Sequence, residues 1–191
     1  TMDNVGFYSS LGFTPGHLTV TLTLEAARSG VQSTLMSSLN PHERELALHQ
    51  CRRALDQLAP GYDYTREIVL TAQHELGDTL FVRKGNEIVA YAICHVAPLV
   101  EGRATEEVRV LKMVARSEAD FDHLVTQLCA HARARGGRRV AIRVQGQYSD
   151  VYRKLMSRGA RVRWTDLRMA VHEYPEVRPR GDGIVLSNWE I

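Results

Sequence analysis

The pattern of apolar and polar positions predicts a mixed sheet flanked by helices. Helices are expected where apolar residues recur every three to four positions, and strands where they alternate with polar residues or run together. The predicted helices cover residues 4–11, 41–59, 63–76, 118–135 and 150–158. The predicted strands cover residues 18–24, 79–83, 87–94, 106–115, 138–145, 160–171 and 183–191. The sequence therefore predicts the α/β class, with an α+β type of mixed sheet.

Local signals fix several of these boundaries. Asn40-Pro41-x-Glu43 and Ser117-x-x-Asp120 are typical helix starts, while Lys84-Gly85-Asn86 between two apolar runs predicts a hairpin. Pro15-Gly16 predicts a turn, and the Ser/Gly-rich residues 27–39 predict a linker or loop. The strand at 106–115 is apolar on both faces, which favours a central position in the sheet.

The two ends of the chain resemble each other. VGFYSSLGF followed by HLTVTLTL parallels VYRKLMSRGA followed by RVRWTDLRMAV, and matching Gly12 with Gly159 places Tyr8 opposite Leu155. This internal repeat predicts that residues 1–25 are the tail end of a first copy and that residues 26–191 form a second. The apolar strand at 18–24 must then pair with this chain's own sheet or with a second molecule, giving a homodimer through the strand or a sheet edge.

Composition and charge exclude several functions. The chain has 191 residues, 44% of them hydrophobic and 24% charged, with a net charge of +2, so a nucleic-acid footprint is not expected. No apolar run reaches the ~20 residues of a membrane span, and no signal peptide is evident. The three cysteines are odd in number and lie in apolar surroundings, which favours a reduced, cytoplasmic protein. The histidines and cysteines lack the spacing of a zinc site, so we expect no metal.

Asn4-x-x-x-Tyr8-x-x-Leu11-Gly12-Phe13 resembles the penultimate helix and turn of the GNAT acetyltransferase superfamily, N-x-x-(F/L)-Y-x-x-L-G-F. The order of elements over residues 40–191 also resembles a GNAT domain. The chain as a whole resembles the C-terminal part of a bacterial tandem-GNAT protein with a degenerate second domain. The resemblance implies a GNAT-like acyl-CoA N-acyltransferase fold with an extra N-terminal helix and strand.

The resemblance also implies acetyl-CoA as cofactor and a place for it. In the family, pantetheine pairs with the exposed backbone of the strand that matches 108–114, and the following loop binds pyrophosphate through backbone N–H groups. The implied cofactor-binding residues are Met113, Val114, Ala115 and Ser117. The family loop is (Q/R)-x-x-G-x-(G/A). Here it is a shorter ARSEADFD without glycine, and its carboxylates are expected to repel a phosphate and to suit a helix start instead.

The implied chemistry is transfer of an acetyl group from the thioester to an amine, with a base and an acid assisting. By resemblance Tyr8 is the candidate acid and Glu107 the candidate base, with Glu106 as its alternate. In the second copy Leu155 replaces the tyrosine; Tyr148 and Tyr152 are the nearest substitutes. Two hypotheses follow: an acyl-CoA-dependent N-acyltransferase at the level of the parent protein, or a non-catalytic GNAT-like domain with a structural, dimerisation or ligand-binding role. The acceptor amine is not specified by any motif.

Overall fold

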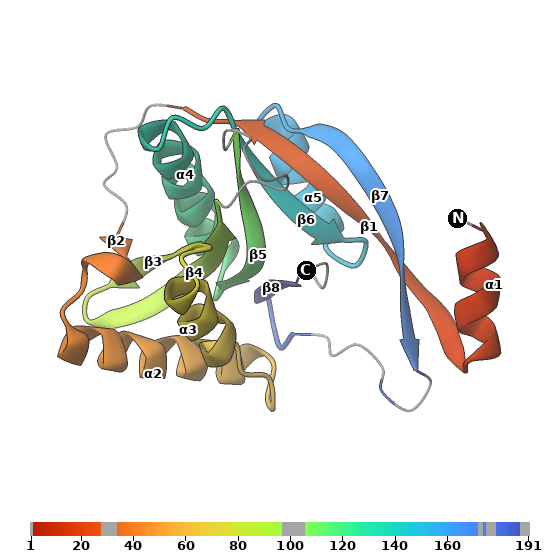
Figure 1. Cartoon of the computed structure of the whole chain (residues 1–191), viewed down its shortest axis with the longest axis horizontal. Coiled ribbons are helices and arrows are strands. Elements are labelled where there is room, and N and C mark those ends of the chain that lie inside the picture. Colours follow the sequence, from red (N-terminus) through yellow and green to blue (C-terminus); the bar gives the residue numbers. More distant parts are fainter. Residues whose placement is uncertain (1, 28–33, 97–105, 172–173, 175–178, 188–191) are drawn as a thin grey trace.

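The computed structural model describes residues 2–27, 34–96, 106–171, 174 and 179–187, and it contains one mixed sheet of eight strands (Figure 1). The strand order is β2-β3-β4-β5-β6-β1-β7, with β8 paired to β5. The helices are α1 (Met2–Ser10), α2 (Pro41–Leu58), α3 (Thr65–Gln73), α4 (Glu118–Ala134) and α5 (Ser149–Ser157), with a 3-10 turn at Met36–Ser38. The strands are β1 (Phe13–Glu25), β2 (Thr34–Leu35), β3 (Gly77–Lys84), β4 (Glu87–His95), β5 (Glu107–Ala115), β6 (Arg139–Gln145), β7 (Arg161–Val171) and β8 (Ile184–Ser187).

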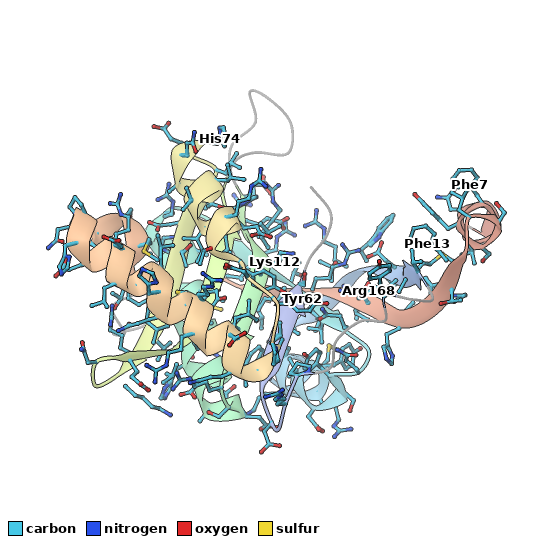
Figure 2. The ribbon with its side chains drawn as sticks, turned by 90° about the horizontal axis from the view of Figure 1, so that it is seen from below. Phe7, Phe13, Tyr62, His74, Lys112 and Arg168 are labelled. Atoms are coloured by element: carbon cyan, nitrogen blue, oxygen red, sulfur yellow. The ribbon has the colours of Figure 1, made fainter. Side chains whose placement is uncertain are left out.

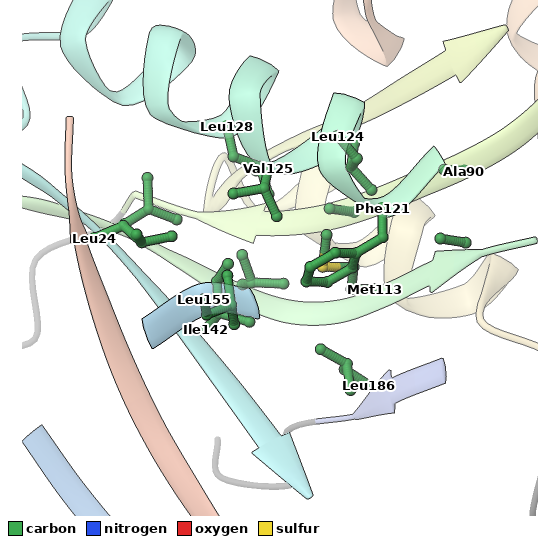
Figure 3. Close-up of a cluster of buried hydrophobic side chains, with 14 of the residues drawn as sticks. Leu24, Ala90, Met113, Phe121, Leu124, Val125, Leu128, Ile142, Leu155 and Leu186 are labelled. Atoms are coloured by element: carbon green, nitrogen blue, oxygen red, sulfur yellow. The ribbon is translucent and has the colours of Figure 1, made fainter. Parts of the chain in front are cut away.

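Two apolar layers hold the sheet. On one face α4 and α5 bury Phe121, Leu124, Leu128 and Leu155 against β1, β5 and β6 (Figure 3). On the other face α2 and α3 pack against β3, β4 and β5. Strand β5 therefore contributes to both layers, as the apolar run at 106–115 predicts. None of the helices in the described part of the chain has the length and apolar character to cross a bilayer.

The predicted helix starts are confirmed by their hydrogen bonds. Asn40 and Glu43 form a reciprocal capping box at the start of α2. Ser117 accepts a hydrogen bond from the backbone N–H of Asp120 at 3.2 Å at the start of α4. Each cap satisfies backbone donors that the first turn of a helix cannot pair internally.

Strand β1 joins this chain's own sheet, which answers the question left open by the sequence. It lies between β6 and β7 and is antiparallel to both. The turn predicted at Pro15-Gly16 is wrong, because the strand runs through these residues from Phe13 and absorbs them in a register shift between Pro15 and Leu18. At its start β1 meets α1, which lies at the far end of the β1–β7 ribbon, away from the other helices (Figure 1).

Part of the predicted linker at 27–39 is ordered. Strand β2 and the 3-10 turn occupy Thr34–Leu35 and Met36–Ser38, and residues 28–33 lie outside the described residues. Two-residue strands give no period to detect, so the sequence pattern missed them. The last predicted strand, 183–191, is described as β8 over Ile184–Ser187, and residues 188–191 are not described.

Candidate functional site

Strands β5 and β6 diverge, and the candidate site lies where they part. They pair in parallel only from Glu107 to Arg109, against Arg139 to Ala141. Beyond that point a register shift against β4 inserts Leu111 as an extra residue in β5. Leu111 and its neighbour Lys112 then both face the layer that contains α2 and α3. Bulges of this kind bend a strand and redirect its side chains.

The chain's own strand β8 fills the space opened by this divergence. It pairs antiparallel with β5 from Lys112 to Ala115, opposite Ser187 to Ile184 (Figure 1). The backbone edge of β5 over Met113, Val114 and Ala115 is the edge that the resemblance assigns to pantetheine. In this structure that edge is paired with β8.

Side chains from three neighbouring segments hold β8 in place. Tyr148, which follows β6, donates its hydroxyl to the carbonyl of Val185 at 3.0 Å and accepts from the N–H of Val185 at 3.1 Å. Arg168 of β7 donates to the carbonyl oxygen of Ser187 at 2.9 Å. Lys112 donates to the hydroxyl of Ser187 at 2.7 Å. Each of these bonds is lost if β8 leaves its position.

Lys112 is a buried cation at the centre of this arrangement. Its side chain is 3% exposed and its Nζ lies 5.0 Å from the centre of the Tyr64 ring, in cation–π geometry. Burial lowers the pKa of Lys112 to about 8. The negative charge of Glu67 acts in the opposite direction and raises this pKa, while the positive charge of Arg168 lowers it further. Burial also raises the pKa of Tyr64 to about 12, although a hydrogen bond with Ser187 opposes the shift.

The start of α4 is already satisfied by protein groups. Asp120 is buried, its carboxylate accepts from the Ser117 hydroxyl at 2.7 Å, and Lys84 of the β3–β4 hairpin pairs with it at 2.7 Å. Glu118 and Asp122 both pair with Lys154 of α5, at 3.0 and 2.7 Å. Ser117, predicted to bind cofactor, is therefore a helix cap, as the competing interpretation of the loop expects.

Glu107, the candidate base, lies at the opposite end of β5 from this helix start. Its carboxylate is 11% exposed and accepts two hydrogen bonds from Arg163 of β7, at 2.6 and 2.5 Å. The alternate candidate, Glu106, pairs with Arg139 at 3.5 Å. Both carboxylates are thus engaged by arginines, Glu107 by Arg163 of β7 and Glu106 by Arg139 of β6.

Tyr8, the candidate acid, lies on α1, and the structure does not bring it to Glu107. Its ring packs edge-on against Phe7 and Phe13, and 45% of the residue is exposed. Figure 2 shows Phe7 on the same helix, far from Tyr62 and Lys112 near the middle of the sheet. The part of the β1–β7 ribbon that separates α1 from the middle of the sheet is about ten residues long, or roughly 30 Å. Leu155, which replaces the tyrosine in the second copy, is fully buried in the core.

An open cleft of about 1260 Å³ runs along the inner side of the β1–β7 ribbon. Tyr8 borders it at the α1 end, while Tyr62 and Ser187 border it near β8. An ion pair between Arg143 and Asp166 lies in its wall. The cleft is large enough for a small-molecule ligand, and it mixes aromatic with charged groups in the way such sites do.

Comparisons with known proteins support the fold. No family profile and no curated protein matches the sequence. Among solved structures, an acetyltransferase of the GNAT family from Colwellia psychrerythraea superposes with a TM-score of 0.56 at 12% identity, over 85% of this chain and 60% of its own. A GCN5-related N-acetyltransferase from Sphaerobacter thermophilus gives 0.54 at 13% identity, over 88% and 56%. A putative GNAT acetyltransferase from Novosphingobium aromaticivorans gives 0.52 at 15% identity, over 83% and 65%.

A conserved protein of unknown function from Staphylococcus epidermidis is similar as well, with a TM-score of 0.55 at 12% identity, over 88% of this chain and 66% of its own. The fold is the GNAT fold, a mixed α/β sheet, as the sequence predicts. The chain spans 56% to 66% of the length of these four proteins.

The residues described do not fit acetyl-CoA in this arrangement. The β5 edge from Lys112 to Ala115 is paired with β8, and the start of α4 presents carboxylates where the family presents glycine. A pyrophosphate beside Glu118 and Asp122 would face like charges. No catalytic step through the cofactor is therefore derived for this domain.

Sequence reasoning missed the two features that define the site. Lys112 lies in an apolar strand, and a single lysine in such a strand is normally expected to be exposed. Here it is buried, because the bulge at Leu111 changes the face of the sheet to which Lys112 points. The pairing of β8 with β5 joins two segments that are far apart in the sequence, so no local pattern marks it. A lysine within an otherwise apolar run, LKMVA, was the one available signal.

Proposed function

We propose that the protein of which this chain forms a part is an acyl-CoA-dependent N-acyltransferase that transfers an acetyl group to an amine. The supporting observation is the GNAT fold of this unit, in which β5 diverges from β6 next to a bulge in β5. Because β8 fills the gap in this unit, the proposed transfer is assigned to the protein as a whole and not to this unit alone. The similar solved structures described as acetyltransferases support the same proposal at the level of fold.

The first test is a thiol-release assay on the complete polypeptide, with acetyl-CoA and a panel of primary amines. Amine-dependent release of CoA is the expected result, and no release with any amine class would refute the proposal. Tyr8→Phe and Glu107→Gln then separate the two predicted roles. We expect Tyr8→Phe to lower kcat by about a hundredfold, the low end of the range for loss of a general acid. Because Arg163 already engages Glu107, we expect Glu107→Gln to leave kcat within about twofold of the parent protein.

A second function is favoured for residues 26–191 considered alone: a non-catalytic GNAT-fold domain with a structural, dimerisation or ligand-binding role. The observation behind it is β8, which pairs along the β5 edge from Lys112 to Ala115. Calorimetric titration of this chain with acetyl-CoA tests it. No saturable heat is expected; binding in the micromolar range that Met113→Pro abolishes and Tyr8→Phe leaves intact would contradict it.

A further inference from the structure

Among the described residues, most of the large apolar side chains that are exposed lie on the β1–β7 ribbon or next to it. Among the described residues β7 has a strand neighbour on one side only, because the sheet ends there. The large apolar side chains exposed on α1, β1 and β7, or just beyond β7, are Phe7, Tyr8, Leu11, Leu18, Val162, Trp164, Leu167 and Tyr174. Large apolar side chains exposed together on one element favour an interaction site there.

The repeat seen in the sequence gives this ribbon an internal symmetry. Matching Gly12 with Gly159 relates the two copies by 159 − 12 = 147 positions. Both glycines have a φ of +86°, and each lies in the short turn between a helix and a strand of the ribbon. The two copies therefore share a backbone conformation as well as a sequence pattern.

The β1–β7 ladder obeys the same offset. Thr19 pairs with Asp166, and these positions differ by 147, so a two-fold axis passes through this pair near the middle of the ladder. Any regular antiparallel pair of strands has a local two-fold axis through it. The positions of bulges in the two strands need not obey that axis. Here the bulges exchange: residues 16–17 lie opposite Arg168, and residues 163–164 lie opposite Thr21, with all matching positions 147 apart.

Burial breaks this symmetry where β1 pairs with β6. The second half of β1, residues 19–25, pairs with β6 and buries Leu22 and Leu24 in the core. The matching residues of β7 are Met169 and Val171, which are apolar but only half-buried. The half of β7 that corresponds to the covered half of β1 thus has the apolar pattern of a covered strand.

The helices show the same relation. In α5, Leu155 is fully buried in the core of this unit. The matching residue of α1 is Tyr8, which is 45% exposed. Helix α1 lies at the far end of the ribbon, away from α5 and from the other helices (Figure 1).

We propose that the β1–β7 ribbon is a two-fold junction between two GNAT-fold units, in which α1 and β1 are the last helix and strand of the second unit. That unit precedes α1 in the same polypeptide, and its equivalent of β6 pairs antiparallel with β7 over residues 166–171. The similar solved structures, of which this chain spans no more than 66%, leave room for such a unit. The junction does not depend on the proposed acyl transfer, but it assigns Tyr8 to the site of the second unit.

Hydrogen exchange on the complete polypeptide and on residues 1–191 tests the junction. Among the described residues β7 has no second strand neighbour, so in residues 1–191 we expect part of the segment 166–171 to exchange rapidly. In the complete polypeptide the whole segment is paired, and we expect exchange of the fast amides to slow by at least about a hundredfold. The amides of β6, which has neighbours on both sides, serve as the reference in both proteins.

A matched pair of substitutions on β7 gives an independent readout. Met169 corresponds to buried Leu22, so Met169→Asp is expected to lower the Tm of the complete polypeptide by about 5 °C more than that of residues 1–191. Val162 corresponds to exposed Pro15, so Val162→Asp is the control and is expected to shift both proteins equally.

Three results would overturn the junction. One is equal exchange of 166–171 in both proteins, and another is an equal effect of Met169→Asp in both. The third is a stable dimer of residues 1–191 by light scattering that already protects 166–171, because a second copy would then be the occupant. Loss of acyl transfer with an intact exchange pattern would count against the proposed function alone.

Discussion

The buried cation at Lys112 provides the sharpest test of the site, because its effect on stability depends on pH. An unfolded lysine has a pKa of about 10.4, whereas burial lowers the folded pKa to about 8. Between these values the unfolded chain binds more protons than the folded protein. The free energy of unfolding therefore rises with pH in this window, and below pH 8 the full cost of burying the charge remains.

The magnitude follows from linkage. With folded and unfolded pKa values near 8 and 10.4, the contribution of Lys112 to the free energy of unfolding increases by about 2 kcal/mol between pH 7 and pH 9.5. Lys112→Met removes this increment together with the hydrogen bond to Ser187. We expect the mutant to match or exceed the wild type at pH 7 and to fall behind it progressively toward pH 9.5.

The assay is urea unfolding of both proteins at half-unit pH intervals, with the difference in free energy plotted against pH. The control is Lys154→Met, because the hydrogen bonds that Lys154 donates to the carboxylates of Asp122 and Glu118 raise its pKa in the folded protein. An unfolded lysine has a pKa of about 10.4, so Lys154 is mostly charged in both states up to about pH 9.5. Its curve should run parallel to that of the wild type. A Lys112→Met curve that is also parallel would show that Lys112 is solvated, and the burial argument would be refuted.

Other predictions concern the fold. Gly77→Ala should cost more than about 2 kcal/mol, because a Cβ there would lie 1.8 Å from the carbonyl oxygen of Cys94; in Gly6→Ala the Cβ meets nothing within 4 Å, and no loss of Tm is expected. Asn40→Ala should lower the free energy of unfolding by about 1 kcal/mol in urea, through loss of the helix cap; an unchanged value would contradict the capping box. Burial raises the pKa of the Cys51 thiol to about 12 and that of Cys94 further, so a thiol reagent at pH 8 should label neither in the native protein and both in guanidinium; rapid native labelling would show local opening.

Strong periodic patterns in the sequence carried over well to the structure. The helices at 41–58 and 118–134 have apolar stripes with caps, and the hairpin at Lys84 to Asn86 has its turn residues between two apolar runs. These features depend on neighbours within a few positions of the chain. The repeat that matches Gly12 with Gly159 was equally readable, and it relates the two strands of the ribbon.

The candidate site was less accessible from sequence, because it is made by contacts between distant segments. Lys112 meets Ser187 across 75 positions, and Arg163 meets Glu107 across 56. Neither pair has a local spacing that marks it. The predicted roles of Tyr8 and Glu107 came from resemblance, and the structure places these two residues at opposite ends of the ribbon.

The insertion of β1 between β6 and β7 has a consequence for how the chain folds during synthesis. Thr23 must wait for Ala141 and then for Arg161 before its strand has a neighbour on both sides. At roughly 5–20 residues per second, translation of the intervening ~140 residues takes on the order of 7 to 28 seconds. During that interval an early apolar strand has no place in its final sheet. Its alternating threonines make one face of the strand polar, which limits non-native association while the later strands emerge.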